Sequence, residues 1–139
     1  MNFKELLGKQ MLFFDGATGT QLQARGLQPG ELPESWNFTH PDIVEAVHRS
    51  YLDVGSNIVK SNTFGANPLK LAGSGLDCKE TIEAAVAIAR RPAVQGKQIC
   101  CAEFGTDREA VGSLWRFAFE KAVEATAKWY ATALLPVRI

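Results

Sequence analysis

Two short polar segments carry the residues whose types and spacing could do chemistry. The first is Asp15-Gly16-Ala17-Thr18-Gly19-Thr20, and the second is Ser61-Asn62-Thr63-Phe64-Gly65-Ala66-Asn67. A carboxylate such as that of Asp15 can pair with an ammonium group, and successive backbone N–H groups from Gly16 to Thr20 can bind a carboxylate. These residue types suit a site for an amino acid or a small anion.

Each segment also has a purely structural explanation. An Asp-Gly pair is typical of a turn in which the aspartate caps its own loop. Asn62 and Thr63 could equally form hydrogen bonds within their loop. Neither segment, taken alone, shows whether its residues bind a ligand or only form a turn.

Histidine and cysteine side chains do not group into a metal site. His40 precedes a proline and is expected in a turn, and His48 is expected to be partly exposed on a helix; neither has a partner at metal-ligand spacing. Cys100 and Cys101 are adjacent in a predicted strand, so their side chains point to opposite faces. Cys78 is expected in a polar loop. We therefore predict that this chain carries no metal ligands.

Strands and helices are predicted to alternate along the chain. Short apolar runs predict buried strands, and apolar residues at helical spacing predict helices. One helix should begin near Asp42 and end near Gly55, and a later helix should end at Pro92. The predicted strands are 11–14, 57–60 and 98–102, and the predicted helices are 42–54, 81–91 and 119–135. The apolar face expected of the first helix comprises Ile43, Ala46, Val47, Tyr51 and Val54, and that of the second comprises Ile82, Ala85, Val86 and Ala89. The Pro- and Gly-rich stretch 27–41 is expected to be irregular.

This alternation predicts an α/β fold with a parallel sheet. Both polar segments then follow the carboxyl ends of neighbouring strands, which is the functional edge of such sheets. A complete (β/α)₈ barrel needs ~250 residues. The 139 residues therefore form either a small open sheet or the first three units of an incomplete barrel, in a single partial domain.

Composition excludes several classes of partner. Lys plus Arg and Asp plus Glu number 15 each, so no basic surface favours nucleic acid. No apolar run approaches the ~20 residues of a membrane helix, and the start of the chain is too charged for a signal peptide. An odd number of cysteines, three, fits a reducing compartment. We expect a cytoplasmic protein with a small-molecule ligand.

Three motifs in order resemble a known family. Phe14-Asp15-Gly16-Ala17-Thr18-Gly19-Thr20, then Pro33-Glu34-Ser35-Trp36-Asn37, then the Ser61–Asn67 segment are similar to the homocysteine S-methyltransferases, above all to the homocysteine-binding domain of cobalamin-dependent methionine synthases. The resemblance covers about 11–91. It is interrupted afterwards and returns around 118–125, a pattern that a truncated or frame-shifted gene would produce.

The resemblance implies a (β/α)₈ barrel of the TIM type that transfers a methyl group to homocysteine and forms methionine. In the family, zinc held by three cysteines activates the homocysteine thiolate, and cobalamin or another donor carries the methyl group. The resemblance places all three zinc ligands beyond Ile139. No catalytic residue, zinc or cobalamin is therefore expected on this chain, which should be inactive without the remainder of the barrel as its partner.

The resemblance also assigns the substrate-binding residues. Asp15 would hold the homocysteine amino group, and the loop amides would meet its carboxylate. The full set is Asp15, Gly16, Ala17, Thr18, Gly19, Thr20, Asn62 and Thr63. Glu34 and Asn37 are expected to shape the loop, and Trp36 to pack rather than bind. Two alternatives stay open: a non-enzymatic α/β domain that binds an amino acid or anion, and a remnant without function.

Overall fold

The computed structural model describes residues 8–93 and 99–101 of the chain. The elements in these ranges are α2 (Thr18–Gln23), η1 (Pro33–Ser35), α3 (Trp36–Thr39), α4 (Pro41–Asp53), β1 (Ile58–Lys60), α5 (Cys78–Arg90) and β2 (Ile99–Cys101). The helix predicted at 119–135 lies outside the described residues.

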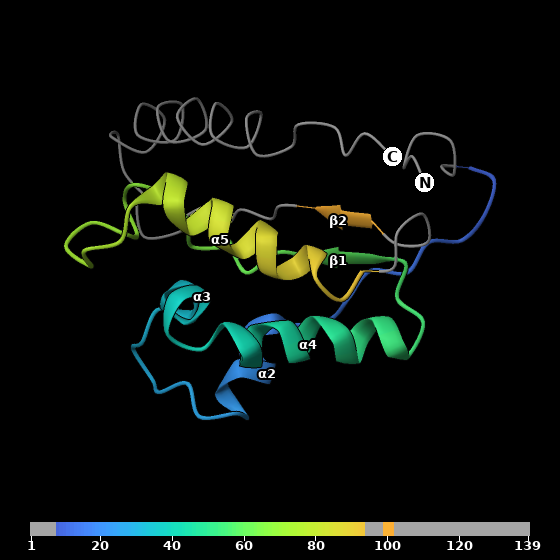
Figure 1. The fold of residues 1–139 in the computed structure, drawn as a ribbon, viewed down its shortest axis with the longest axis horizontal. Helices are drawn as coiled ribbons and strands as arrows, with labels where there is room; N and C mark the ends of the chain where they lie inside the picture. The colour runs from blue at the N-terminus through green and yellow to red at the C-terminus, as the bar shows by residue number, and fades with distance from the viewer. Residues whose placement is uncertain (1–7, 94–98, 102–139) are drawn as a thin grey trace, which may run out of the picture.

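Neighbouring strands run in the same direction. β1 pairs with β2 in parallel, with Ile58 opposite Ile99, and Phe14 adds a parallel bridge to Ile58 on the other side of β1. The two arrows of Figure 1 accordingly point the same way. This confirms the predicted parallel sheet and its alternation with helices.

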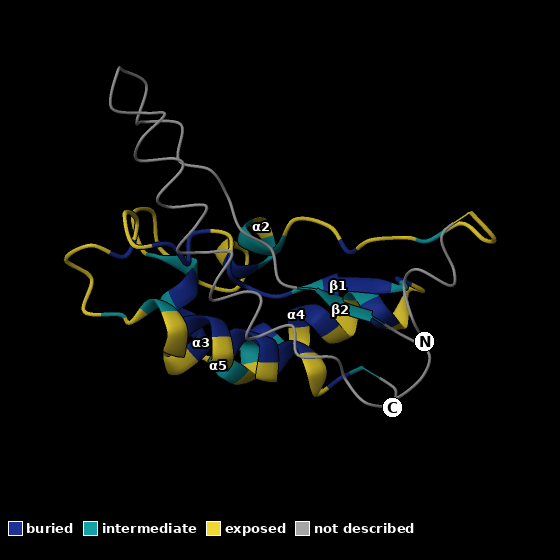
Figure 2. Cartoon of the chain, turned by 90° about the horizontal axis from the view of Figure 1, so that it is seen from above, coloured by how far each residue is buried: buried dark blue, intermediate teal, exposed yellow. Residues whose placement is uncertain are grey.

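Two long helices cover one face of the strand pair. α4 contacts β1 and α5 contacts β2, and the helices also contact each other; Figure 2 shows both helices on the same side of the strands, with their buried surfaces turned inward. The core beneath them is one apolar cluster. Its members are Leu22, Leu27, Trp36, Val44, Val47 and Ile88.

α5 forms as its pattern predicts. The Asp77 side chain accepts a hydrogen bond from the backbone N–H of Glu80, which caps the first turn. The predicted apolar residues are all buried, namely Ile82, Ala85, Val86 and Ala89. Cys78 is a correction: it is the first residue of the helix and not part of a loop, because Asp77 starts the helix three residues earlier than the apolar pattern indicated.

α4 has the predicted ends but buries a different face. Pro41 occupies its first position, and Gly55 ends it with a φ of 103°, which a side chain would disfavour. Val54, expected on the apolar face, is 81% exposed, whereas Leu52 is buried. His48, expected to be partly exposed, is fully buried. The cause is that α2, α3 and α5 all contact α4, so a wider arc of the helix is covered than one apolar stripe indicates.

The first two connecting regions also differ from prediction. Residues 27–41 contain η1 and α3 rather than only irregular chain, because Trp36 is anchored in the core. The first polar segment is a loop only until Ala17, after which α2 begins. The strand predicted at 11–14 is reduced to the bridge at Phe14. It is not buried, since Phe13 and Phe14 are 56% and 55% exposed.

Helices long and apolar enough to cross a membrane are absent from the described part of the chain.

Candidate functional site

A carboxylate joins the ends of two neighbouring strands. Asp15 follows the bridged residue Phe14, and its Oδ2 accepts a hydrogen bond of 2.9 Å from the backbone N–H of Lys60, the last residue of β1. The backbone N–H of Asp15 donates to the carbonyl of Ile58 at 2.9 Å. The two polar segments therefore leave the same edge of the sheet, side by side, as their positions in the sequence predicted.

A glycine lets the first segment lie against α4. A Cβ built on Gly16 would come within 2.8 Å of the Tyr51 hydroxyl oxygen, so a side chain here would displace the Tyr51 ring. The same hydroxyl donates a long hydrogen bond of 3.5 Å to the carbonyl of Ala17. Tyr51 of α4 thus contacts the loop just before the start of α2.

The second segment is fastened by the region that contains η1 and α3. The Asn62 side-chain amide donates to the carbonyl of Pro33 at 2.7 Å and to Asn37 Oδ1 at 3.1 Å. Asn37 Nδ2 donates in return to the carbonyl of Asn62 at 3.0 Å. All these groups lie in buried or partly buried surroundings, where paired amides hold a backbone in one position.

Glu34 completes this attachment. Its Oε1 accepts a hydrogen bond of 2.5 Å from the backbone N–H of Gly65, and the residue is only 2% exposed. A Cβ on Gly65 would lie 2.8 Å from that oxygen, so only glycine allows so close an approach. We call the contacts of Pro33, Glu34 and Asn37 with residues 62–65 the loop clamp.

Thr63 is oriented within its own loop. Its hydroxyl and that of Ser61 lie 2.9 Å apart, and Thr63 is fully buried. Asn62 is also nearly buried. The side chains of both predicted residues thus contribute to the shape of the loop, while both residues also border a pocket.

The pocket has a volume of about 320 Å³ and lies between the two polar segments. That volume is within the usual range for small-molecule sites. Residues from both segments and from the loop clamp line it, together with three others: Ala17, Thr18, Gly19, Pro33, Glu34, Ser61, Asn62, Thr63, Phe64 and Gly65, and then Leu32, Lys60 and Lys70. Five of the eight predicted site residues are therefore brought together, namely Ala17, Thr18, Gly19, Asn62 and Thr63.

The other predicted residues, Asp15, Gly16 and Thr20, do not line this pocket. Two of them position residues near it: Asp15 accepts a hydrogen bond from the Lys60 backbone, and Gly16 lies close to Tyr51. Glu34, Lys60 and Lys70 line the pocket but were not predicted to bind. Glu34 belongs to the Pro33–Asn37 motif, and this motif was the feature of the sequence that could have indicated its place at the site. Sequence reasoning assigned no binding role to Lys60 or Lys70.

Charges of both signs meet at this pocket. Glu34, Lys60 and Lys70 are all among the residues that line it. The Lys70 nitrogen lies 6.0 Å from the centroid of the Phe64 ring. Such a lining suits a ligand that itself carries both charges.

Two of the described cysteines, Cys78 and Cys100, behave as protonated thiols. The Cys78 Sγ donates to the carbonyl of Ala66 at 3.2 Å, and the Cys100 Sγ donates to the carbonyl of Ala89 at 3.1 Å. Burial raises the pKa of both thiols. A zinc ligand must be a thiolate. Within residues 8–93 and 99–101 no three metal-ligating side chains gather, so these residues do not fit a zinc site.

His48 is not part of the pocket. It lies within α4, and neither ring nitrogen has a hydrogen-bond partner in the described part of the chain. Burial lowers the pKa of His48 from 6.5 to about 4, and nearby Glu45 opposes that shift. The ring is therefore neutral at physiological pH and acts as a packing group.

Comparison with known proteins points in one direction. The family model described as homocysteine S-methyltransferase matches residues 12–134. The methionine synthase of Mycobacterium tuberculosis (strain ATCC 25618 / H37Rv) is 36% identical over 99 residues, or 64% of this chain. That of Mycobacterium leprae (strain TN) is 41% identical over 71 residues, or 45% of this chain.

A solved structure has the same fold. The metallated form of the homocysteine methyltransferase MmuM from Escherichia coli superimposes with a TM-score of 0.75 at 25% identity and covers 94% of this chain. The architecture is thus α/β with a parallel sheet, similar to that enzyme's TIM-barrel fold. The chain spans 53% of that structure, and 8% and 6% of the two methionine synthases.

Proposed function

Because this chain belongs to the homocysteine S-methyltransferase family, we propose that its pocket binds homocysteine and that the homocysteine sulfur accepts a methyl group there. In this reaction a sulfur–carbon bond forms, the bond between the methyl group and its donor breaks, and the thiol proton is lost. The product is methionine. One observation carries the proposal: the two polar segments border a single pocket whose lining bears charges of both signs.

The ligand's charges match the lining. A free amino acid carries an ammonium and a carboxylate group, and the described residues that line the pocket include one acidic residue, Glu34, and two basic ones, Lys60 and Lys70. The first N–H groups of α2 add donors, because Ala17 provides no side-chain cap for them. The proposed site comprises Asp15, Gly16, Ala17, Thr18, Gly19 and Thr20 on one side, and Asn62 and Thr63 on the other.

In this proposal Asp15 and Asn62 position the two loops that border the pocket. Asp15 fixes the first segment to the end of β1. Asn62 holds the second loop through Pro33 and Asn37. The backbone of both loops is thereby in place before a ligand arrives, which reduces the cost of ordering on binding.

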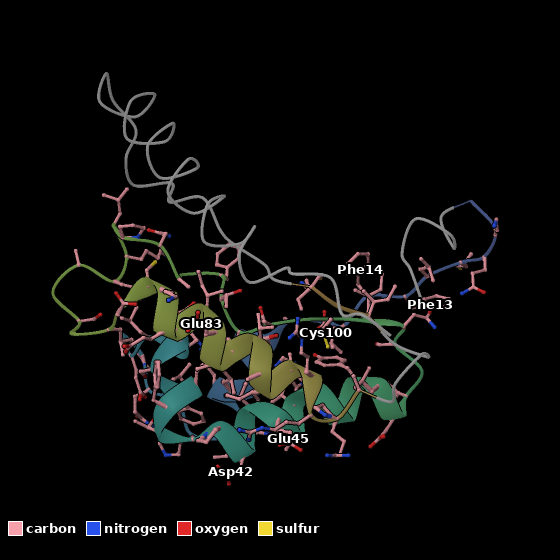
Figure 3. All side chains as sticks on the ribbon, turned by 45° about the horizontal axis from the view of Figure 1, so that its top comes forward. Phe13, Phe14, Asp42, Glu45, Glu83 and Cys100 are labelled. Carbon is pink, nitrogen blue, oxygen red and sulfur yellow. The ribbon has the colours of Figure 1, made fainter. Side chains whose placement is uncertain are left out.

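Catalysis is proposed to need further strands of a barrel. Phe13 and Phe14, both labelled in Figure 3, are more than half exposed, although a closed barrel covers its strands on both sides. The described residues contain no fitting zinc site, so the activated thiolate and the methyl donor, cobalamin or another, are assigned to that remainder. On this proposal the chain alone binds homocysteine without turnover, in a reducing cytoplasm that keeps its thiols free.

The non-enzymatic alternative is supported by one observation. No thiol or imidazole is among the described residues that line the pocket, so these residues offer neither a thiolate nor an imidazole base. A plain amino-acid binder would take alanine or norvaline as tightly as homocysteine. A methyltransferase site should prefer homocysteine.

Calorimetric titration of the chain separates these possibilities. We expect saturable binding of L-homocysteine, weaker binding of L-alanine and no binding of adenosine monophosphate. Zinc should leave the homocysteine isotherm unchanged. Absence of homocysteine binding, or a stronger response to the nucleotide, would contradict the proposal.

A further inference from the structure

The Tyr51 side chain lies against the backbone of the first polar segment. A Cβ on Gly16 would lie 2.8 Å from the Tyr51 hydroxyl oxygen and 3.0 and 3.1 Å from two carbons of its ring, so the ring leaves no room for a side chain there. The hydroxyl group also donates the long hydrogen bond of 3.5 Å to the carbonyl of Ala17. Within residues 8–93 and 99–101, no other side chain forms a hydrogen bond with Gly16 or Ala17. Tyr51 is therefore the side chain that supports this part of the loop.

The Tyr51 ring is itself held in place by the core. It is partly buried and packs against the apolar cluster that contains Leu22 and Trp36. The carbonyl of Tyr51 accepts a hydrogen bond of 3.0 Å from the N–H of Ser56, and the Ser56 hydroxyl donates to the carbonyl of Phe14 at 3.4 Å. Since a close-packed interior resists displacement, the ring is a rigid support for the loop.

The supported loop leads directly into the lining of the pocket, because residues 17–19 follow Gly16 in the chain and border the pocket. Ala17 supplies no side-chain cap to α2, so the start of this helix is not fixed by a capping bond of its own. The position of this side of the pocket therefore depends on Asp15 at one end of the loop and on Tyr51 at the other. Groups that bind a ligand must be held to within about 0.5 Å of their working positions.

Tyr51 is not among the described residues that line the pocket. We propose that Tyr51 is a positioning residue of the ligand site: its ring is a spacer between α4 and Gly16 that holds residues 17–19 where they meet the ligand, and it thereby sets the affinity for homocysteine. This inference rests on the proposed function, because it takes homocysteine as the ligand. A role in packing alone would change the stability of the fold and leave the affinity of the folded chain unchanged.

A pair of substitutions tests the spacer. Gly16→Ala adds a methyl group against the ring, and Tyr51→Leu removes the ring but keeps an apolar side chain beside the core. Each should weaken the binding of L-homocysteine to the folded full chain by about tenfold in calorimetric titration, which corresponds to the loss of one ordered backbone position. The double variant should bind more tightly than Gly16→Ala alone, because the added methyl group then occupies space that the ring has left.

Tyr51→Phe separates the ring from its hydroxyl group. It keeps the ring and loses only the long hydrogen bond to Ala17, so its loss of affinity should be smaller than that of Tyr51→Leu. Val54→Ala is the control on the same helix. Val54 is 81% exposed and is not among the described residues that line the pocket, so this variant should bind homocysteine as the unsubstituted chain does.

The outcomes are distinguishable. Unchanged homocysteine affinity in Tyr51→Leu, or losses that simply multiply in the double variant, would overturn the role of Tyr51 and leave the proposed function intact. Failure of the unsubstituted chain to bind homocysteine would overturn both. If Tyr51→Leu does not fold, Gly16→Ala is compared with the double variant of Gly16→Ala and Tyr51→Phe, which lacks the hydroxyl oxygen nearest to the added methyl group. Its affinity should partly recover, and no recovery would refute the spacer.

Discussion

The Asp15 carboxylate and the backbone N–H of Lys60 form a hydrogen bond of 2.9 Å across two neighbouring parallel strands. Asp15 begins the first polar segment, and Lys60 immediately precedes the second. This bond therefore sets the distance between the two sides of the pocket. Stability and binding should both depend on it.

Replacement of Asp15 should separate its role as acceptor from its charge. The residue is 7% exposed, so loss of its acceptor leaves the Lys60 N–H unsatisfied in a mostly buried place. We expect Asp15→Ala to lower the free energy of unfolding by about 1–3 kcal/mol. Asp15→Asn should cost less, because its amide oxygen can accept the same bond. Urea denaturation followed by circular dichroism measures both, and equal losses would show that charge dominates.

The paired asparagines of the loop clamp should be energetically coupled. Asn37 and Asn62 exchange hydrogen bonds of 3.0 and 3.1 Å. A double-mutant cycle with Asn37→Ala and Asn62→Ala should give a coupling energy of about 1 kcal/mol in unfolding. Additive effects of the two substitutions would mean that the amides do not stabilise each other.

Substitution by alanine should have opposite effects on stability at two glycines of the pocket lining. Gly65→Ala forces a Cβ to within 2.8 Å of the Glu34 carboxylate, whereas a Cβ on Gly19 meets nothing within 4 Å. We expect Gly65→Ala to destabilise the fold by about 1–3 kcal/mol. Gly19→Ala, within α2, should be neutral or stabilising by up to about 1 kcal/mol. Thermal unfolding of the pair, measured side by side, checks the contrast; a tolerant Gly65 would contradict the close contact.

His48 should make the fold sensitive to acid. Its pKa is about 4 in the folded chain and 6.5 without burial, so the unfolded chain binds a proton more readily between these values. Stability contributed by the neutral ring is complete above pH 6.5 and is lost as the pH falls through this window. The loss at pH 4 relative to pH 7.5 is about 3 kcal/mol.

His48→Leu tests this assignment, because leucine fills a similar buried volume without titrating. Its free energy of unfolding should fall less between pH 7.5 and pH 4 than that of the unsubstituted chain. Identical pH profiles for the two proteins, measured by urea denaturation, would show that the acid sensitivity comes from other groups.

The spacing of apolar residues predicted those parts of the fold that depend mainly on the nearby sequence. The apolar face of α5 from Ile82 to Ala89 was predicted correctly, and so were the order of elements from α4 to β2 and the adjacency of the two polar segments. For α4 the same reasoning selected Val54, which is exposed, and missed His48, which is buried. Four elements, α2, α3, α5 and β1, contact this helix, and the spacing of apolar residues within the helix does not indicate these neighbours.

The pocket was predicted in position but not in all its chemistry. Ala17, Thr18 and Gly19 line the pocket together with residues of the second segment; their contact with a substrate stays a prediction. Glu34 could not be assigned from local sequence, because its burial arises from Gly65, 31 positions away. A carboxylate in a Pro-rich segment is ordinarily exposed, and only the tertiary contact makes it part of a site.

The most direct measurement is an amide chemical-shift titration of the isotope-labelled chain with L-homocysteine. If the two polar segments form one amino-acid pocket, amides of 17–19 and of 61–65 must shift together, with one common dissociation constant. Exposed positions on α5, such as Glu83, should stay unchanged. Shifts confined to one segment, or two segments that titrate with different constants, would contradict the account.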